Sequence, residues 1–202
     1  MKTVIIKYNA GNIRSVTFAL ERIGVNATIT DDINEIISAD KVIFPGVGEA
    51  SSAMKYLRER KLDEVIRSLK QPVLGICLGM QLMCDHSEEA DTKCLGIFNL
   101  NVKLFSPSPL ERAGVRHKVP QIGWNNIFDL KLPLFNNMNE NTYMYFVHSY
   151  YAELGENTIA KADYGINYSA ALQKNNFYAT QFHPEKSGEV GEQILKNFVD
   201  MP

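Results

Sequence analysis

The sequence has little of what would tie it to a membrane or to nucleic acid. No apolar run approaches the roughly 20 residues that cross a bilayer. The opening stretch MKTVIIKYNAGN turns polar too early for a signal peptide. A net charge of -2 gives no general attraction to polyanions. We therefore expect a cytoplasmic protein that has neither a membrane nor a nucleic acid as its partner.

Cysteine is also scarce. Cys77, Cys84 and Cys94 are an odd number without CxxC spacing, which argues against a disulfide framework and against a structural zinc site. We expect reduced thiols. No linker, repeat or low-complexity tract divides the 202 residues, so we expect one domain over residues 1–202.

The first half of the chain alternates short β-branched runs with longer amphipathic segments, which is typical of a parallel sheet with crossover helices. Apolar residues at helical spacing run from Ile13 to Ile23, where Gly24 ends the segment, and again from Met54 to Leu69. The predicted strands of this half are Thr3–Lys7, Lys41–Phe44 and Pro72–Ile76.

The second half is richer in strands than in helices. A last helix is predicted over Gly188–Val199, and the segment Ser106–His117, with two prolines and a glycine, is predicted to be an exposed loop. The fold class is therefore α/β, with a largely parallel central sheet, flanking helices and a strand-rich C-terminal half. The strands predicted here are Leu100–Phe105, Ile122–Phe128, Tyr143–Val147, Ile159–Ala162, Ser169–Gln173 and Phe177–Phe182.

The stretch PVLGICLGMQ contains the first candidate for chemistry. A strand that ends in Gly75-Ile-Cys77-Leu-Gly79 and continues into a helical segment has the pattern of a nucleophile elbow, with cysteine as the nucleophile. The two glycines remove side chains that would collide in a sharp turn. Taken alone, the pattern leaves a second interpretation open, in which Cys77 is a small buried side chain at a strand end.

A thiolate that attacks a carbonyl needs a base, and the base needs an orienting group. His183 and Glu185 are the candidates, because alternation along a strand over residues 179–185 would put both on one side. His86 and His117 lie in polar surroundings, and His148 has no adjacent carboxylate. The other interpretation of His183 and Glu185 is a solvated strand end.

Backbone donors for an oxyanion are the third requirement. The loop Pro45-Gly-Val-Gly48 follows a predicted strand of the same parallel sheet, so it should lie at the carboxyl edge beside Cys77. Its N–H groups, with that of Leu78, could face the carbonyl under attack. An ordinary turn is the alternative.

Together, Pro45-Gly-Val-Gly48, Gly75-Ile-Cys-Leu-Gly79 and Phe182-His-Pro-Glu185 resemble the triad-type, class I glutamine amidotransferases over essentially the whole chain. Further stretches are similar to the glutaminase subunits of imidazole glycerol phosphate synthases. These are Tyr8-Asn-Ala-Gly-Asn12, Pro120-Gln-Ile-Gly-Trp-Asn125, Tyr145-Phe-Val-His-Ser-Tyr-Tyr151 and Thr180-Gln-Phe-His-Pro-Glu-Lys-Ser-Gly188.

The resemblance implies hydrolysis of L-glutamine to glutamate and ammonia through a thioester on Cys77, with His183 as base and then acid and Glu185 orienting it. It implies no metal or organic cofactor. The implied partner is a cyclase subunit of (β/α)8 barrel form that receives the ammonia. The remaining site residues carried over are Gly46, Val47 and Leu78 for the oxyanion hole, and Gln81, Glu89, Ser149 and Tyr150 for glutamine.

The docking face should surround the mouth of the active site, because ammonia must leave without meeting water. Trp124, Tyr145 and Lys186 are the candidates for a gate or interface, although the two aromatic residues could be core and the lysine a solvated charge. Two other functions stay open at this stage: a paralogous glutaminase with another ammonia acceptor, and a stand-alone cysteine hydrolase of the same fold.

Overall fold

Alternating apolar residues of the inner strands fill a core on each face of the central sheet. The computed structural model describes residues 1–9, 11–105, 118–131 and 133–202. In the first strand, β1 (Thr3–Ile6), Val4 and Ile6 face one core and Ile5 faces the other. Side chains along a strand point alternately to opposite faces, so a strand that is apolar at every position lies between two helical layers.

Five strands form the parallel part of the sheet, in the order β2-β1-β3-β4-β13. The carboxyl ends of β3 and β4 lie side by side, because Gly46 pairs with Cys77. Beyond β1, these strands are β2 (Ala27–Thr30), β3 (Lys41–Gly46), β4 (Val73–Cys77) and β13 (Phe177–Thr180).

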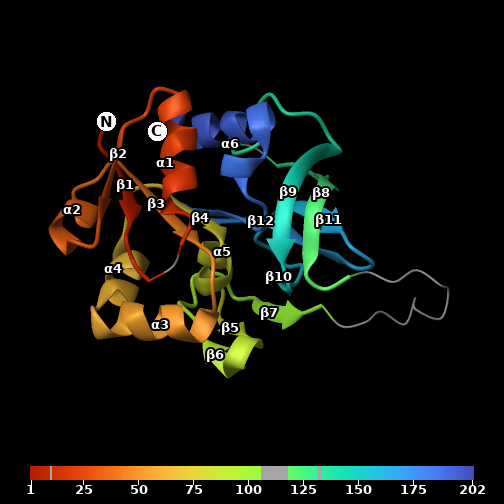
Figure 1. The fold of residues 1–202 in the computed structure, drawn as a ribbon, viewed down its shortest axis with the longest axis horizontal. Coiled ribbons are helices and arrows are strands. Elements are labelled where there is room, and N and C mark those ends of the chain that lie inside the picture. The colour runs from red at the N-terminus through yellow and green to blue at the C-terminus, as the bar shows by residue number, and fades with distance from the viewer. Residues whose placement is uncertain (10, 106–117, 132) are drawn as a thin grey trace.

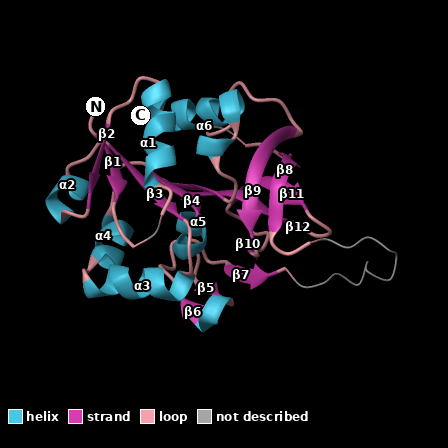
Figure 2. Cartoon of the chain, viewed as in Figure 1, coloured by secondary structure: helices cyan, strands magenta, loops and turns pink. Residues whose placement is uncertain are grey.

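Helices cover both faces of this sheet (Figures 1 and 2). Buried residues of α1 and α6 belong to one core, and buried residues of the other four helices belong to the second core. The first layer comprises α1 (Ile13–Arg22) and α6 (Gly188–Asp200). The second comprises α2 (Ile33–Ile37), α3 (Ala50–Glu59), α4 (Leu62–Ser68) and α5 (Leu78–Met83).

The strand-rich second half continues the same sheet with mostly antiparallel pairing, in the order β13-β12-β10-β7-β5-β6, and β11 pairs with β12. These strands are β5 (His86–Ser87), β6 (Thr92–Lys93), β7 (Asn101–Leu104), β10 (Tyr150–Ala152), β11 (Thr158–Asp163) and β12 (Asn167–Lys174). Two short 3-10 helices are η1 (Glu89–Asp91) and η3 (Pro184–Lys186).

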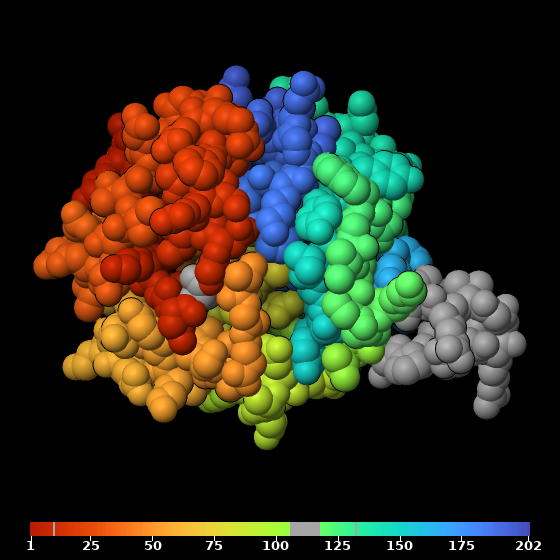
Figure 3. Space-filling view, viewed as in Figure 1, coloured from red at the N-terminus to blue at the C-terminus, as the bar shows by residue number. Residues whose placement is uncertain are grey.

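A separate antiparallel pair, β8 (Gln121–Ile127) with β9 (Thr142–His148), lies beside α6. Its residues Ile127, Met144 and Phe146 pack into the core under α1 and α6. Figure 3 shows this pair, in green and teal, beside α6 in blue. The α/β class, the parallel centre and the strand-rich second half are confirmed.

Two local predictions are wrong. The apolar stripe from Met54 to Leu69 is divided between α3 and α4, because Lys61 adopts a left-handed φ of 57° that ends the first helix. No glycine or proline marks this break. The predicted strand over residues 179–185 ends at Thr180, and the chain then turns into η3. The loop predicted over Ser106–His117 lies outside the described residues.

Candidate active site

Cys77 occupies a strained turn between β4 and α5, with φ 53° and ψ -107°. Residues with a side chain rarely adopt this conformation, and such strain persists only where the surrounding structure enforces it. Gly79 lets the turn pack closely against β3, since a Cβ at this position would overlap the carbonyl oxygen of Phe44. At Gly75, a Cβ would lie 2.9 Å from the Met83 sulfur. The predicted elbow is therefore present, and its two glycines permit close packing.

Cys77 is only 6% exposed. Its Sγ lies 3.9 Å from the carbonyl oxygen of Val147, to which the S–H can donate, and 3.7 Å from Nε2 of Gln181, which donates to the sulfur. Cys84 and Cys94 are also free thiols, and burial is the main cause that raises the pKa of each, to about 12 for Cys94. Cys77, by contrast, lines a cavity.

His183 and Glu185 form a buried pair behind the nucleophile. Nδ1 of His183 lies 2.7 Å from Oε1 of Glu185, and the Nδ2 amide of Asn12 donates to the same carboxylate oxygen. A carboxylate can only accept, so Nδ1 carries a proton and Nε2 faces the cysteine side. Nε2 forms no hydrogen bond with any described residue. The 3-10 turn of η3, rather than strand alternation, brings Glu185 to the ring.

Opposing effects act on the His183 imidazole. Its burial disfavours the charged ring, but the Cys77 sulfur and the Glu185 carboxylate favour it more strongly and raise the pKa of His183 to about 10. The ring is therefore protonated at neutral pH. This arrangement supplies a proton beside the nucleophile, as acyl transfer with an amine leaving group requires.

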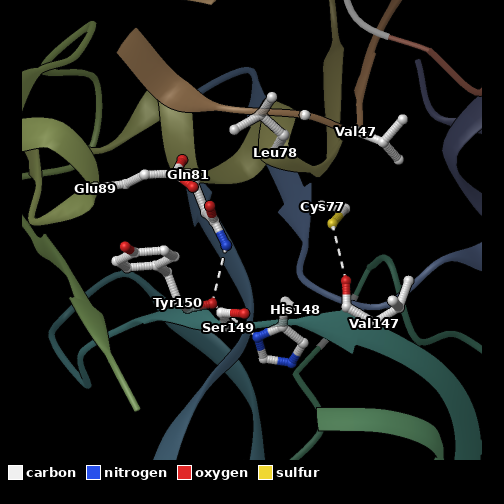
Figure 4. Close-up of a pocket in the computed structure, with 10 residues that line it drawn as sticks. Val47, Cys77, Leu78, Gln81, Glu89, Val147, His148, Ser149 and Tyr150 are labelled. Carbon is white, nitrogen blue, oxygen red and sulfur yellow. Dashed lines mark hydrogen bonds between the residues drawn. The ribbon is translucent and has the colours of Figure 1, made fainter. Parts of the chain in front are cut away.

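Beside Cys77 lies a cavity of about 270 Å³, a size suited to one small metabolite. In Figure 4, Gln81 and Tyr150 lie together on one side of the residues that line the cavity, and Cys77 lies toward the other side. The cavity is lined by Val47, Gly48, Cys77, Leu78, Gln81, Glu89, Val147, His148, Ser149 and Tyr150. Six of the predicted site residues besides Cys77 are therefore brought together here: Val47, Leu78, Gln81, Glu89, Ser149 and Tyr150.

Gly46 does not line the cavity but supports its wall. It pairs with Cys77 across β3 and β4, and a Cβ at this position would overlap the hydroxyl of Tyr8 and lie 2.9 Å from Cβ of Leu78. The Tyr8 hydroxyl is buried and forms no hydrogen bond with a described residue. The segment from Gly46 to Gly48 is therefore held next to the nucleophile.

Glu89, one of the predicted glutamine ligands, is held at one of its two carboxylate oxygens. Its Oε2 accepts a hydrogen bond of 2.7 Å from the backbone N–H of Ala50 at the start of α3. Burial raises the pKa of Glu89, partly offset by that hydrogen bond. One carboxylate oxygen is thus fixed, and the side chain lines the cavity opposite Cys77 as a partner for a cationic group.

Several site residues were missed from the sequence. His148 lines the cavity, yet burial lowers its pKa to about 4, and its Nδ1 contacts the Tyr150 carbonyl at 2.7 Å, so it is neutral. Asn12 and Gln181 contact the triad candidates, although both lie within stretches that carried the family resemblance. His86 instead pairs with Asp91 at 2.8 Å, and His117 lies outside the described residues.

The three interface candidates lie together outside the cavity. Trp124 on β8 is 56% exposed, so the core interpretation is wrong for it. Its ring meets that of Tyr145 edge to face, with centroids 6.0 Å apart. The Nζ of Lys186 lies 5.8 Å from the Tyr145 ring centre. Lys186 follows Glu185 directly, so this exposed cluster is joined to the triad candidates through η3.

Comparison with known proteins identifies the family. A family profile described as "Glutamine amidotransferase class-I" matches residues 4–201. The chain belongs to the class-I glutamine amidotransferase family. Within this family it is 57% identical to "Imidazole glycerol phosphate synthase subunit HisH" of Bacteroides fragilis (strain YCH46), over 100% of both chains. It is 47% identical to the protein of the same name from Haemophilus influenzae (strain ATCC 51907 / DSM 11121 / KW20 / Rd), over 97% of this chain and 96% of that one.

Solved amidotransferases share the fold at much lower identity. A "Crystal structure of glutamine amidotransferase" superposes with a TM-score of 0.74 at 16% identity, covering 98% of this chain and 97% of the other. A putative GMP synthase component from Thermoplasma acidophilum gives 0.71 at 20% identity, covering 98% and 92%. These structures support the class-I amidotransferase fold of the chain.

Over the described residues, no group of three or more His, Cys, Asp or Glu side chains is arranged to hold a metal ion. Within that same part of the chain, no helix is both long and apolar enough to span a membrane.

Proposed function

We propose that this amidotransferase is the glutaminase subunit of an imidazole glycerol phosphate synthase. It hydrolyses L-glutamine and supplies the ammonia to a cyclase subunit in histidine biosynthesis. The observation that carries the proposal is the cysteine at the strained elbow, backed by a buried His–Glu pair, in a chain 57% identical to a HisH subunit over its whole length. Residues 1–202 act as one amidotransferase domain, and the protein works in the cytoplasm.

Substrate binding uses the polar groups around the cavity. The Glu89 carboxylate attracts the α-ammonium group of glutamine, and Gln81, Ser149 and Tyr150 offer polar groups for its α-carboxylate and α-amino ends. The side-chain amide of the glutamine substrate then extends toward Cys77, which lies on the other side of the cavity in Figure 4.

The chemistry begins when the Cys77 thiolate attacks the side-chain carbonyl carbon of glutamine. The C–S bond forms as the carbonyl π electrons move to oxygen, and the N–H groups of Val47 and Leu78, in the wall supported by Gly46, stabilise that oxyanion. The oxyanion then collapses and the C–N bond breaks. The leaving nitrogen takes the proton held on His183 and departs as ammonia, which leaves a γ-glutamyl thioester on Cys77.

Hydrolysis completes the cycle. His183, now neutral, accepts a proton from water while the water oxygen attacks the thioester carbonyl. Collapse of the second tetrahedral intermediate breaks the C–S bond, releases glutamate, and regenerates the thiolate beside a protonated His183. Glu185 and Asn12 keep the imidazole in one orientation and tautomer through both halves.

The partner is a cyclase subunit of (β/α)8 barrel form, and it docks around the exposed cluster of Trp124, Tyr145 and Lys186. Ile122 and Tyr143 on the same strand pair are 63% and 60% exposed, which extends the apolar surface. An aromatic anchor with an adjacent cation is typical of interface hot spots. Ammonia would pass under this covered face to form imidazole glycerol phosphate and aminoimidazole carboxamide ribotide.

A coupled assay tests the proposal. The chain is combined with the candidate cyclase, glutamine and the phosphoribulosyl aminoimidazole carboxamide substrate, and both products are measured. We expect Cys77→Ala to abolish glutamine-dependent synthesis while added ammonia still supports it. Glutamine-dependent synthesis by Cys77→Ala would overturn the role of Cys77, and glutamine hydrolysis without any coupled synthesis would favour a stand-alone hydrolase or another ammonia acceptor.

A further inference from the structure

The buried Cys77 sulfur needs nearby donors if it is to carry a negative charge. Cys77 is 6% exposed, so its thiolate loses most of its hydration, and α5, which follows it, has only six residues and therefore a small dipole. Besides the His183 imidazolium, Nε2 of Gln181 is a side-chain N–H donor near Sγ among the described residues, at 3.7 Å. Gln181 is fully buried and lies two residues before His183.

A chain of hydrogen bonds fixes which end of the Gln181 amide meets the sulfur. Nε2 of Gln81 donates to the backbone carbonyl of Tyr150 at 2.9 Å, as Figure 4 shows. A carbonyl can only accept, so the Gln81 amide cannot be reversed. The same Nε2 lies 3.0 Å from Oε1 of Gln181 and donates its second hydrogen there. Gln181 must therefore present its oxygen to Gln81 and its N–H to Cys77.

This orientation favours one charge state of the nucleophile. The neutral thiol can donate its hydrogen to the Val147 carbonyl, 3.9 Å away, but the thiolate has no hydrogen to donate. The N–H of Gln181 interacts more strongly with the thiolate than with the thiol, because hydrogen bonds to charged acceptors are the stronger ones. The contact therefore lowers the free energy of the ionised form relative to the neutral form.

We propose that Gln181 is a second donor, besides the His183 imidazolium, that stabilises the Cys77 thiolate, and that Gln81 and the Tyr150 carbonyl hold its amide in the productive orientation. This inference rests on the proposed role of Cys77 as the nucleophile. In this arrangement Gln81 both contacts the substrate and orients Gln181. The amides of Gln81 and Gln181 thus connect the glutamine cavity to the Cys77 sulfur.

The test compares Gln181→Met and Gln181→Glu with the parent chain. Alkylation of Cys77 by iodoacetamide is followed across a pH range by peptide mass spectrometry, which separates Cys77 from Cys84 and Cys94. In Gln181→Met the side-chain length is kept and the donor is lost, so we expect the midpoint of the rate curve to move to higher pH. At neutral pH, both the alkylation rate and kcat for glutamine should fall on the order of 10-fold, with KM changing little.

Gln181→Glu keeps an acceptor for Gln81 but turns a carboxylate oxygen toward the sulfur, so its midpoint should lie higher still. Gln173→Met on β12 is the matched control, since the Gln173 amide donates to the Asn175 carbonyl at a turn remote from the cavity, and its curve should match the parent. Should Gln181→Met fail to fold, Gln181→Leu, which also removes the donor without adding a charge, decides the question.

An unchanged alkylation curve in the folded Gln181 variants would overturn the inference, even if their activity fell. The alkylation result does not depend on whether the proposed function is right, because alkylation of Cys77 requires neither the cyclase nor an ammonia acceptor.

Discussion

The strain at Cys77 can be measured directly by comparing two substitutions that both remove the sulfur. With φ 53° and ψ -107°, position 77 holds a conformation that glycine adopts freely and alanine does not. We expect Cys77→Gly to gain stability relative to Cys77→Ala by relief of about 1–3 kcal/mol of backbone strain. Both variants lack the nucleophile, so differences in catalysis do not enter.

Two opposing contributions must be removed from this comparison. Glycine costs about 0.4–1 kcal/mol relative to alanine through the entropy of the unfolded chain. Loss of the buried Cβ costs about 0.8 kcal/mol more. Cys84 supplies the reference, because it is a buried cysteine with an ordinary φ of -69°. There, Cys84→Gly should be less stable than Cys84→Ala by the sum of these two contributions alone.

The assay is urea unfolding of all four variants at one temperature, followed by circular dichroism. Subtracting the glycine–alanine difference at position 84 from that at position 77 should leave about 1–3 kcal/mol, or about 2–4 °C in Tm for each kcal/mol in a chain of this size. A double difference of zero would refute the reasoning, since it would mean that the elbow stores no strain.

Three further predictions concern neighbouring positions. Gly79→Ala should lower the free energy of unfolding by about 1–3 kcal/mol and reduce glutaminase activity, because the new Cβ overlaps the Phe44 carbonyl oxygen; unchanged values in urea unfolding and glutamine assays would contradict this. The pKa of His183 is raised from 6.5 to about 10, so protonation of His183 stabilises the folded state fully below pH 6.5, and this stabilisation is lost as pH rises through 10. In His183→Gln, the free energy of unfolding should therefore decline less steeply over this pH range. A decline as steep as that of the parent would contradict this prediction. Trp124→Ala should weaken cyclase binding by at least about 10-fold by calorimetry, whereas Ile37→Ala, which trims a 53% exposed side chain on α2, should not; equal effects would remove Trp124 from the interface.

Local sequence was sufficient for the elements whose signals are local. The β-branched run at Thr3–Ile6 and the helical stripe ended by Gly24, which has a φ of 81°, were predicted correctly because periodicity and a left-handed glycine mark them directly. The break between α3 and α4 could not be predicted, because Lys61 takes up a left-handed φ that lysine seldom adopts and that no neighbouring glycine or proline marks. The strands β5, β6 and β10 gave no recognisable signal because they have only two or three residues each, too few for strand alternation to show.

The sequence by itself determined that a cysteine between two glycines would form a strand-to-helix elbow, because the crowding of such a turn excludes larger side chains at both positions. It also supplied the resemblance that predicted His183 and Glu185 as partners. Tertiary structure alone decided how these groups meet: a 3-10 turn carries Glu185 to the imidazole, and Asn12, from the opposite end of the chain, donates to the same carboxylate.

The surroundings of the nucleophile were likewise decided by tertiary structure. Gln181 reaches the Cys77 sulfur because β13 pairs with β4 in parallel, which sets the two carboxyl ends side by side. Its amide has one orientation because Gln81 is anchored on the Tyr150 carbonyl from a third segment. Hydrogen bonds between distant segments depend on register and side-chain direction, and these are set by the packing of the whole sheet.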